Sequence, residues 1–276
     1  MKKLITTVAL FALALTPFVT AQATPAEDKV ALKAYFTKTL AGKDQNDFIN
    51  GVYALDDDAR SQWEEIEEFP PYEIDLDNGS EIWDKKFANG KSFESCFGEL
   101  SKIRAKYPYH DEAKDTIITL EGDINKCLTD NGEKPFKWKK GNIAAVSAHI
   151  AYAGRGGKIS VVPKTEKALA WYNKGKQFFY AKRGQLNLSC ADCHVYNANR
   201  RARGDLLSPM LGHPSHFPVF RSKWGNLGTL HRRYGGCNKN VRAKPFKAQS
   251  DEYKAMEYFQ AAMADGMELN GPGARK

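Results

Sequence analysis

Apolar residues recur at helical spacing in three separate stretches of the chain. The stretches are residues 29–42, 141–154 and 250–266, and each predicts one helix. The first ends at Gly42, a typical stop residue, and the last begins at Ser250, a favoured N-cap residue. Alternation of Val, Ile and Thr, which is typical of strands, is scarce. The pattern therefore predicts a mainly α fold with long polar connections and few strands.

The first 23 residues have the layout of a secretory signal peptide. Two lysines precede an apolar run, and residues 21–23 form a small-x-small cleavage site. A membrane anchor is the alternative, but the run is broken by Pro17 and is too short to span a bilayer. We therefore expect cleavage near Ala23 and a periplasmic mature protein, in a compartment that permits disulfides.

Charge divides the chain into two unequal parts. Residues 24–165 carry 20 Lys and Arg against 25 Asp and Glu, whereas residues 166–276 carry 19 against 8. The change falls within residues 154–168, which hold three glycines and a proline, so we place the domains at residues 24–160 and 161–276. A basic part can bind nucleic acid, anionic lipid or an anionic substrate, and nucleic acid is not expected as a partner of an exported protein.

An internal repeat indicates that the two domains are related. Cys96 matches Cys190 at an offset of 94 residues, and Cys127 matches Cys237 at an offset of 110. The further matches are Gly90 with Gly184, Ser95 with Ser189, and the KPFK of residues 134–137 with the KPFK of residues 244–247. Each KPFK begins seven residues after its cysteine, and a predicted helix follows it. We therefore expect two similar domains in tandem.

The segment NLSCADCHVY contains the motif that carries chemistry. Cys190, Cys193 and His194 form the C-x-x-C-H pattern of covalent haem attachment. Two thiols on one turn can each form a thioether with a haem vinyl group, and the histidine after them then lies under the iron. A redox dithiol would need a strand of a βαβ unit, and a zinc site would need a second ligand pair. Neither is evident, so the motif predicts one covalently bound haem c.

The first repeat has lost this motif. Cys96 remains, but Glu99 and Leu100 stand where the second repeat has its second cysteine and its histidine. The fold class we expect is therefore mainly α, with two cytochrome c-like domains in tandem and no haem in the first. Cys96 and Cys127 would then face the same pocket and form a disulfide, which an oxidising compartment favours. The alternative is two separate buried thiols.

One cysteine, Cys237, has no partner in this scheme. Its surroundings, residues 231–247, contain six positive charges and no acidic residue. The six are Arg232, Arg233, Lys239, Arg242, Lys244 and Lys247. Such a field lowers the pKa of a thiol and attracts an anionic substrate, so Cys237 is a candidate reactive group. The alternative is an inert cysteine in a solvated loop.

The patterns leave open which residue binds iron opposite the histidine. Met210 is the nearest methionine after the motif, and a methionine ligand raises the haem potential, whereas a Cys237 thiolate would lower it. The further options are Met256, Met263, Met267, His213, His216 and His231. Each of these is explained as well by a structural role.

The haem motif, the segment RRYGGCNKNVRAKPF and the degenerate first domain together resemble the SoxA family, the catalytic cytochromes of bacterial thiosulfate oxidation. The resemblance covers nearly the whole mature chain and matches the single-haem form. It implies that Cys190 and Cys193 attach the haem, with His194 and Cys237 as iron ligands. It also implies that Cys237, found in the family as a persulfide, is catalytic and that Arg233 binds thiosulfate.

The resemblance further implies a reaction and its partners. Thiosulfate would be joined oxidatively to a cysteine of a SoxY-type carrier protein, the reaction of an L-cysteine S-thiosulfotransferase. A small haem subunit, SoxX, would form a heterodimer with this chain and pass two electrons to a soluble cytochrome c. One alternative is a plain periplasmic electron-transfer cytochrome c. Another is an interaction subunit that docks through its acidic segment, residues 55–84, which by itself predicts a solvated surface.

Overall fold

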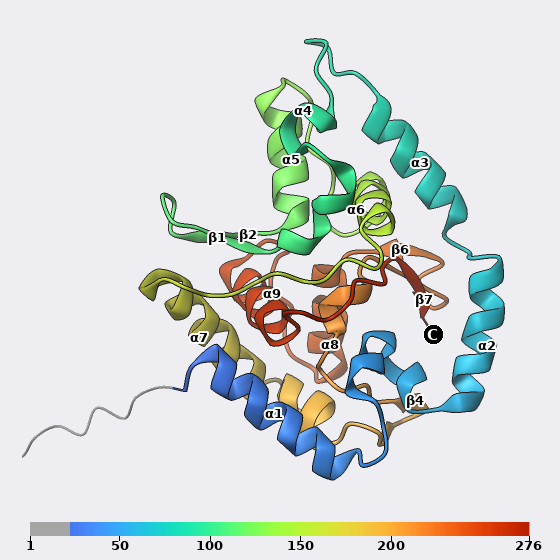
Figure 1. The fold of residues 1–276 in the computed structure, drawn as a ribbon, viewed down its shortest axis with the longest axis vertical. Coiled ribbons are helices and arrows are strands. Elements are labelled where there is room, and N and C mark those ends of the chain that lie inside the picture. The colour runs from blue at the N-terminus through green and yellow to red at the C-terminus, as the bar shows by residue number, and fades with distance from the viewer. Residues whose placement is uncertain (1–22, 276) are drawn as a thin grey trace, which may run out of the picture.

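The computed structural model describes residues 23–275 and consists mainly of helices, with strands of two or three residues each (Figure 1). Three helices coincide with the three apolar patterns, namely α1 (Pro25–Thr39), α6 (Asn142–Ala153) and α9 (Asp251–Met263). The mainly α class is therefore confirmed. Nearly all of the predicted signal peptide lies outside the described residues. Within them, no helix is both long and apolar enough to cross a bilayer.

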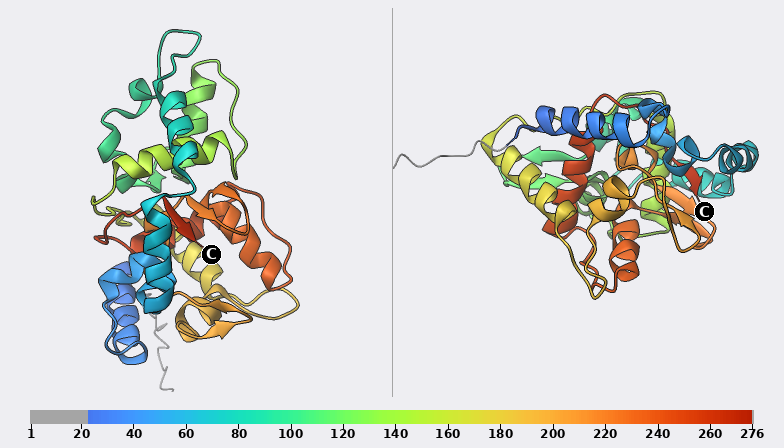
Figure 2. Two further views of the ribbon diagram at one scale, coloured as in Figure 1. Left: turned by 90° about the vertical axis from the view of Figure 1, so that its right-hand side faces the viewer. Right: turned by 90° about the horizontal axis from the view of Figure 1, so that it is seen from below.

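The first half forms a small unit at one end of the molecule (Figures 1 and 2). Its elements are α3 (Glu73–Asp84), α4 (Phe93–Phe97), the short turns η2 (Leu100–Lys102) and η3 (Arg104–Lys106), β1 (Tyr109–Asp111), β2 (Thr116–Ile118), α5 (Leu120–Asp130) and α6. Trp83, Phe93, Ile124 and Ile143 lie at the centre of its apolar core.

The second half has the larger core and more irregular connections. Its elements are α7 (Glu166–Tyr180), η4 (Asp192–Tyr196), β3 (Arg201–Ala202), β4 (Asp205–Leu206), η5 (His213–His216), β5 (Val219–Arg221), β6 (Asn226–Gly228), α8 (Leu230–Asn240) and α9. The last strand, β7 (Gly273–Arg275), pairs in parallel with β5 and completes a three-stranded sheet of order β6-β5-β7.

The two halves repeat the same order of elements. The hairpin β1–β2 and helix α5 return 110 residues later as β5–β6 and α8, with identical lengths. Each hairpin also follows a cis proline, Pro108 in the first half and Pro218 in the second. The repeat that the cysteines and the KPFK segments indicated is therefore confirmed by the backbone, and the tandem arrangement with it.

A glycine allows the main helix crossing in each half. A Cβ at Gly79 of α3 would lie 2.3 Å from the carbonyl oxygen of Ala145 in α6. A Cβ at Gly175 of α7 would lie 2.0 Å from the carbonyl oxygen of Ala255 in α9. Both distances are shorter than real contacts allow, so only glycine lets these two pairs of helices pack.

Equivalent residues also make the contact between the halves. The hydroxyl of Thr119, which caps α5, donates to Gln249 Oε1 at 2.9 Å, while the hydroxyl of Thr229, before α8, donates to the carbonyl of Trp138 at 3.1 Å. The backbone N–H of Thr229 donates to Lys139, the residue equivalent to Gln249, at 3.2 Å. The halves therefore meet through reciprocal contacts, as a pair related by an approximate two-fold axis does.

Two titratable residues lie at equivalent positions of this contact. Glu121 in α5 accepts a hydrogen bond from Ser147 at 3.2 Å, and His231 in α8 lies 3.0 Å from the Glu257 carboxylate. Burial raises the pKa of Glu121, and the nearby Glu257 raises it further, against the opposing charges of His231 and Arg104.

The N-terminal helix packs on the second half. Leu32 and Phe36 of α1 are buried in the same apolar cluster as Tyr172 of α7, and the Tyr172 hydroxyl donates to Asp28 at 2.8 Å. From there η1 (Gln45–Ala54), α2 (Asp57–Glu68) and α3 lead along one side to the first half (Figure 1). Helix α1 thus belongs to the expected first domain, residues 24–160, but packs on the second half. The domain limits stay a prediction.

The acidic segment, residues 55–84, is only partly the solvated surface that the sequence predicts. Helix α2 has no buried residue, and Phe69 and Ile74 are each 84% exposed. In contrast, Tyr72 and Trp83 are buried, because α3 packs against α6. One side of the segment is therefore exposed to solvent, and the other side packs into the core.

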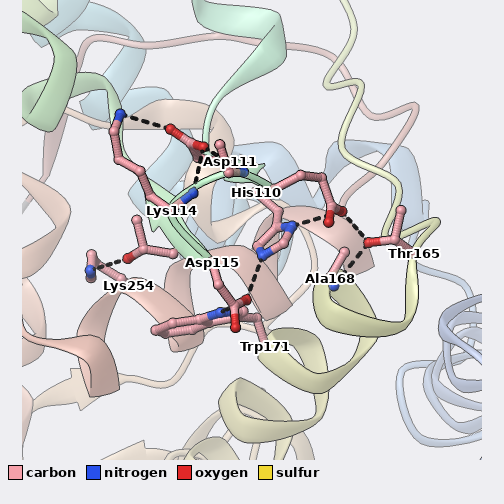
Figure 3. Close-up of polar contacts among 11 residues, drawn as sticks. His110, Asp111, Lys114, Asp115, Thr165, Ala168, Trp171 and Lys254 are labelled. Atoms are coloured by element: carbon pink, nitrogen blue, oxygen red, sulfur yellow. Dashed lines mark hydrogen bonds and ion pairs between the residues drawn. The ribbon is translucent and has the colours of Figure 1, made fainter.

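A polar network attaches the β1–β2 hairpin to α7 (Figure 3). The ring nitrogens of His110 each lie 3.0 Å from a carboxylate, Nδ1 from Glu112 and Nε2 from Asp115. Asp115 also accepts a hydrogen bond from the Trp171 indole at 3.2 Å, and Glu112 accepts one from Thr165. These bonds join the first half to the start of the second and fix their relative orientation.

Candidate functional site

The haem motif forms a helical turn that leads into η4. Ser189 and Asp192 cap this turn, because Asp192 accepts hydrogen bonds from the Ser189 N–H at 2.7 Å and from its hydroxyl at 2.9 Å. The bond from the Ser189 backbone lowers the pKa of Asp192, which therefore stays ionised. Cys190 and Cys193 are thus held on one turn, as two adjacent thioether bonds require.

The imidazole of His194 has one nitrogen fixed and the other available. Nδ1 lies 2.8 Å from the carbonyl oxygen of Ser208. Because a carbonyl only accepts, Nδ1 carries the proton and donates it, which leaves Nε2 as a free ligand nitrogen. The carbonyl of His194 also accepts the N–H of Met210 at 2.9 Å, so the ring is held by the segment that follows it.

Cys237 lies on helix α8 and not in the solvated loop that was the alternative for this segment. Its half-buried thiol is within hydrogen-bonding reach of His194, from another element of the fold. Burial acts to raise the pKa of Cys237, but Arg233, His194 and Arg221 together outweigh burial and lower the pKa to about 7. A large share of this sulfur is therefore thiolate at neutral pH.

The pKa values of the two motif cysteines are shifted in the opposite direction. Burial raises the pKa of Cys190 to about 12 and also raises that of Cys193. The Cys190 sulfur lies 3.9 Å from the Met256 sulfur, within an apolar part of the core. The site therefore contains two protonated thiols on the motif turn and, near the histidine, one thiol with a lowered pKa.

The other candidate ligands are engaged elsewhere. His213 Nε2 lies 2.9 Å from the Ser208 hydroxyl, and His216 Nδ1 lies 2.9 Å from the carbonyl oxygen of Ile49. His231 is paired with a carboxylate, and Met263 accepts a hydrogen bond from Tyr172 at 3.4 Å. Met210 and Met267 are buried in the main apolar core. These contacts favour Cys237 over the histidines and methionines.

Two consecutive arginines of α8 have different surroundings. The Arg233 charge acts on Cys237 and on the half-buried His213, so it lies near both side chains. Arg232 instead donates to Asn226 and to the carbonyl of Leu227 at 3.1 Å, and it lies over the Trp224 ring at 4.1 Å. Only Arg233 of this pair is therefore placed to hold an anion.

Arg221 is a further basic residue whose charge acts on Cys237, and the sequence patterns do not point to it. It lies on β5, outside the basic segment, and its charge acts on both Cys237 and Arg233. The repeat contains a signal for it, because at an offset of 110 Arg221 and Arg233 correspond to Asp111 and Asp123 of the first half. A search for charge reversals between the repeats would have found both arginines.

The donor set fits a c-type haem. Two thiols on one turn suit thioether bonds, and Nε2 of His194 and the sulfur of Cys237, which come from different elements, are the atoms that could bind the iron. Gly236, next to Cys237, has no atom within 4 Å of the position of a Cβ, so a flat group can approach this face of α8 closely. Over residues 23–275 no three His, Cys, Asp or Glu side chains gather in a group that could hold a bare metal ion.

The equivalent place in the first half is closed by a disulfide. Cys96 of α4 and Cys127 of α5 are bonded, with their Cα atoms 6.1 Å apart. The Asn131 amide donates to the carbonyl of Cys127 at 2.8 Å beside the bond. Glu99, where the second half has Cys193, faces solvent and pairs with Lys102 at 2.5 Å. This half therefore offers no ligand set of the kind found in the other.

A protein family model matches two stretches of the chain. Residues 78–159 and 174–269 match the cytochrome c domain of the SoxA/TsdA family. The two matched stretches correspond to the two halves of the repeat, from α3 to α6 and from α7 to α9.

Individual relatives agree with this match. A SoxA subunit of L-cysteine S-thiosulfotransferase from Chlorobaculum tepidum is 54% identical over 90% of this chain and 87% of its own length. The corresponding subunit from Allochromatium vinosum is 45% identical over 92% and 91%. The crystal structure of SoxXA from P. pantotrophus has a chain with 31% identity and a TM-score of 0.69, over 75% of this chain and 79% of that one.

Proposed function

The chain belongs to the SoxA/TsdA cytochrome c family, and from this we propose that it joins thiosulfate to a cysteine of a carrier protein by oxidation. The enzyme is an L-cysteine S-thiosulfotransferase, the activity for which its relatives are named. One observation carries the proposal, namely that Cys237 of α8 lies within hydrogen-bonding reach of His194 and near the Arg233 charge, which together lower its pKa.

The haem site uses residues of the second half only. Cys190 and Cys193 would attach a single haem c covalently, and His194 and Cys237 would bind its iron. A bound haem would supply one-electron redox chemistry next to the sulfur. The Ser208 carbonyl, 2.8 Å from Nδ1 of His194, fixes the imidazole so that its Nε2 would be the ligand atom.

The first step makes a sulfur–sulfur bond at Cys237. Cys237–SH and S₂O₃²⁻ give Cys237–S–S–SO₃⁻, one proton and two electrons. The bound thiosulfate group therefore carries one negative charge instead of two. The lowered pKa of Cys237 supplies the thiolate for this step, and Arg233 holds the sulfonate oxygens in a forked arrangement.

The second step transfers the group to the carrier. A carrier thiolate attacks the sulfur bound to the sulfonate, which yields carrier–S–S–SO₃⁻ and returns Cys237 as thiolate. If Cys237 carries the additional sulfur of a persulfide, the outer sulfur takes the place of Sγ in both steps. No atom of the protein is consumed, and the two electrons leave for an external acceptor.

The partners follow from the relatives and from this chemistry. The similar chain in the P. pantotrophus structure is part of a SoxXA complex, so a small haem subunit of the SoxX type is the proposed partner in a heterodimer. A SoxY-type carrier protein accepts the thiosulfate group, and a soluble cytochrome c accepts the electrons. The predicted signal peptide and the disulfide support a periplasmic location.

The test uses the purified heterodimer with thiosulfate, a cysteine-containing carrier and oxidised cytochrome c. Cytochrome reduction should require both thiosulfate and the carrier, and the carrier should gain one thiosulfonate group for every two electrons. Electron transfer without any change in the mass of the carrier would indicate a plain electron-transfer cytochrome and would refute the proposal.

A further inference from the structure

Arg104 of the first half reaches across the contact between the halves. It lies on η3 and is only 5% exposed, and its Nη2 donates to the carbonyl oxygen of Pro214 in η5 at 2.7 Å. Its Nη1 donates to the carbonyl oxygen of Tyr107, in its own half, at 3.1 Å. A buried guanidinium that bonds to main-chain carbonyls of both halves holds η3 and η5 in one relative position.

The repeat places this contact on the approximate two-fold axis. Arg104 and Pro214 are equivalent residues, at the same offset of 110 that relates Pro108 to Pro218. A contact between two equivalent residues lies on the axis that relates them. The contact is nevertheless one-sided, because Pro214 has no charged side chain that could return the bond. The half without the haem motif therefore supplies the cation that holds the other half.

Two carboxylates, one from each half, compensate the buried charge. Burial lowers the pKa of Arg104, whereas the charges of Glu257 in α9 and Glu121 in α5 act to raise it. Glu257 is itself buried. Removal of the guanidinium would leave these two acids without their cation, so the position favours a permanent positive charge.

The bond to Pro214 acts on the segment that holds the imidazole of His194. Residues 207–212 belong to no helix or strand, and η5 follows directly. The Ser208 carbonyl oxygen lies 2.8 Å from His194 Nδ1, and the Ser208 hydroxyl lies 2.9 Å from His213 Nε2. His213 precedes Pro214, and its ring meets the His194 ring edge to face at 4.5 Å. Printed contacts thus lead from Arg104 through η5 and Ser208 to His194.

The segment between the motif and η5 is longer than its equivalent in the first half. The offset between equivalent residues is 94 at the motif and 110 at η5, which leaves the second half with 16 more residues between them. A longer connection has more conformations to lose when it is ordered. An anchor at the end of this segment therefore contributes more to its order than an anchor on a helix would.

We propose that Arg104 is a positioning residue for the reaction, through which the first half holds η5 and Ser208 and thereby fixes the plane of the His194 imidazole. The inference goes beyond the proposed function and rests on it only in that His194 is an iron ligand. It gives the first half a role in the chemistry, although that half offers no such ligand set. Groups that orient a ligating imidazole also tune the metal, so a haem spectrum reports their effect independently of turnover.

The experiment compares Arg104→Met, Arg104→Lys and the control Lys106→Met in the haem-loaded heterodimer. Lys106 is an exposed cation of the same turn. The ferric spin-resonance spectrum of Arg104→Met should show shifted low-spin g values or a second low-spin species. Its kcat should fall roughly tenfold with an unchanged KM for thiosulfate, because the substrate site is intact. Arg104→Lys, which can still donate to Pro214, should lie between, and Lys106→Met should match wild type.

The spectrum separates positioning from a role in stability alone. Wild-type g values in a folded Arg104→Met variant would overturn the proposal, however much its stability had changed. A wild-type heterodimer that transfers no thiosulfate, with shifted g values in Arg104→Met, would instead refute the proposed function and leave the role of Arg104 standing.

Ser208→Ala covers the case in which Arg104→Met does not fold. It removes the hydroxyl that contacts His213 and keeps the carbonyl that faces His194. The spectrum should change in the same direction as in Arg104→Lys, and the double variant should change no further than the larger single variant, because both act on one series of contacts. A wild-type spectrum in Ser208→Ala, or additive changes in the double variant, would contradict the proposal.

Discussion

The two halves of the chain share one backbone plan, and they use the same helix position for opposite purposes. Cys127 is the eighth residue of α5 and Cys237 the eighth residue of α8, 110 positions later. In the first half the sulfur is bonded to Cys96, whereas in the second it faces His194 and has a pKa lowered to about 7. The fold therefore supplies the position, and the neighbouring side chains decide the chemistry.

The difference comes from few residues. Leu100 stands in place of the histidine, Glu99 in place of the second motif cysteine, and Asp111 and Asp123 in place of two arginines. A positive charge near a thiol lowers its pKa and a negative charge raises it, and in the first half Cys127 is in addition bonded to Cys96 and does not titrate. The scaffold of helices and hairpin does not change between the two cases.

The largest expected effect is that of Cys237→Ser. The variant should still attach haem through Cys190 and Cys193, but an alcohol cannot form the sulfur–sulfur link, so thiosulfate transfer should fall by more than about 10⁴-fold. The ferric spectrum should also change, because a hydroxyl is a poor iron ligand. Steady-state transfer kinetics and an optical and spin-resonance spectrum check both. A variant with wild-type turnover and spectrum would remove the catalytic role.

Arg233→Ala should have the next largest effect, on activity alone. Loss of a hydrogen bond to a charged group costs about 1.5–3 kcal/mol, so kcat/KM for thiosulfate should fall roughly ten- to hundredfold with the haem spectrum nearly unchanged. Arg232→Ala is the matched control, since Arg232 contacts Asn226 and Trp224. It should lower stability and leave kcat/KM almost intact; the reverse ranking of the two variants would refute the assignment.

Cys127→Ser tests the same helix position in the other half. It opens a disulfide between residues 31 apart in sequence, and the unfolding free energy should fall by about 3–4 kcal/mol by loss of the chain constraint. Thiosulfate transfer should persist at temperatures where the variant is folded. Denaturant unfolding and transfer kinetics measured on one preparation check the two expectations. Loss of transfer by a folded, haem-loaded variant would show that the halves are not functionally separate.

The smallest effect concerns Glu121 and its dependence on pH. Burial raises the pKa of Glu121 above its ordinary value of 4.5, so ionisation of this carboxyl destabilises the folded state. The destabilisation is absent well below pH 4.5 and grows as the pH rises through and above that value. Glu121→Gln should therefore melt higher than wild type at pH 7, by about 2–4 °C per kcal/mol, and not at pH 4. The exposed Glu99→Gln is the control, and an equal shift at both pH values would contradict the explanation.

The sequence predicted much of this arrangement, because cysteines and periodic apolar residues are strong signals. The haem motif, the repeat, three helices and the pairing of Cys96 with Cys127 could all be read directly. Helix α8 was hidden, because its Gly235 and Gly236 and its dense charge resemble a loop, and packing on the core overrides those preferences.

The sequence pattern does not indicate contacts between residues that are distant in sequence. Arg221 acts on Cys237 from the β5–β6 hairpin, and α1 covers the second half through its buried face, neither of which spacing indicates. The different roles of Arg232 and Arg233 likewise depend on Trp224, which fixes one guanidinium and leaves the other to the site. Such choices arise from tertiary packing and not from local sequence.

Mass analysis of the intact wild-type heterodimer, before and after thiosulfate, tests the central claim most directly. Peptides should show one haem on Cys190 and Cys193, a disulfide between Cys96 and Cys127, and a thiosulfate-derived sulfur group on the Cys237 peptide that mild reductant removes. A second haem, free thiols at Cys96 and Cys127, or a Cys237 peptide that never carries additional sulfur would contradict the account.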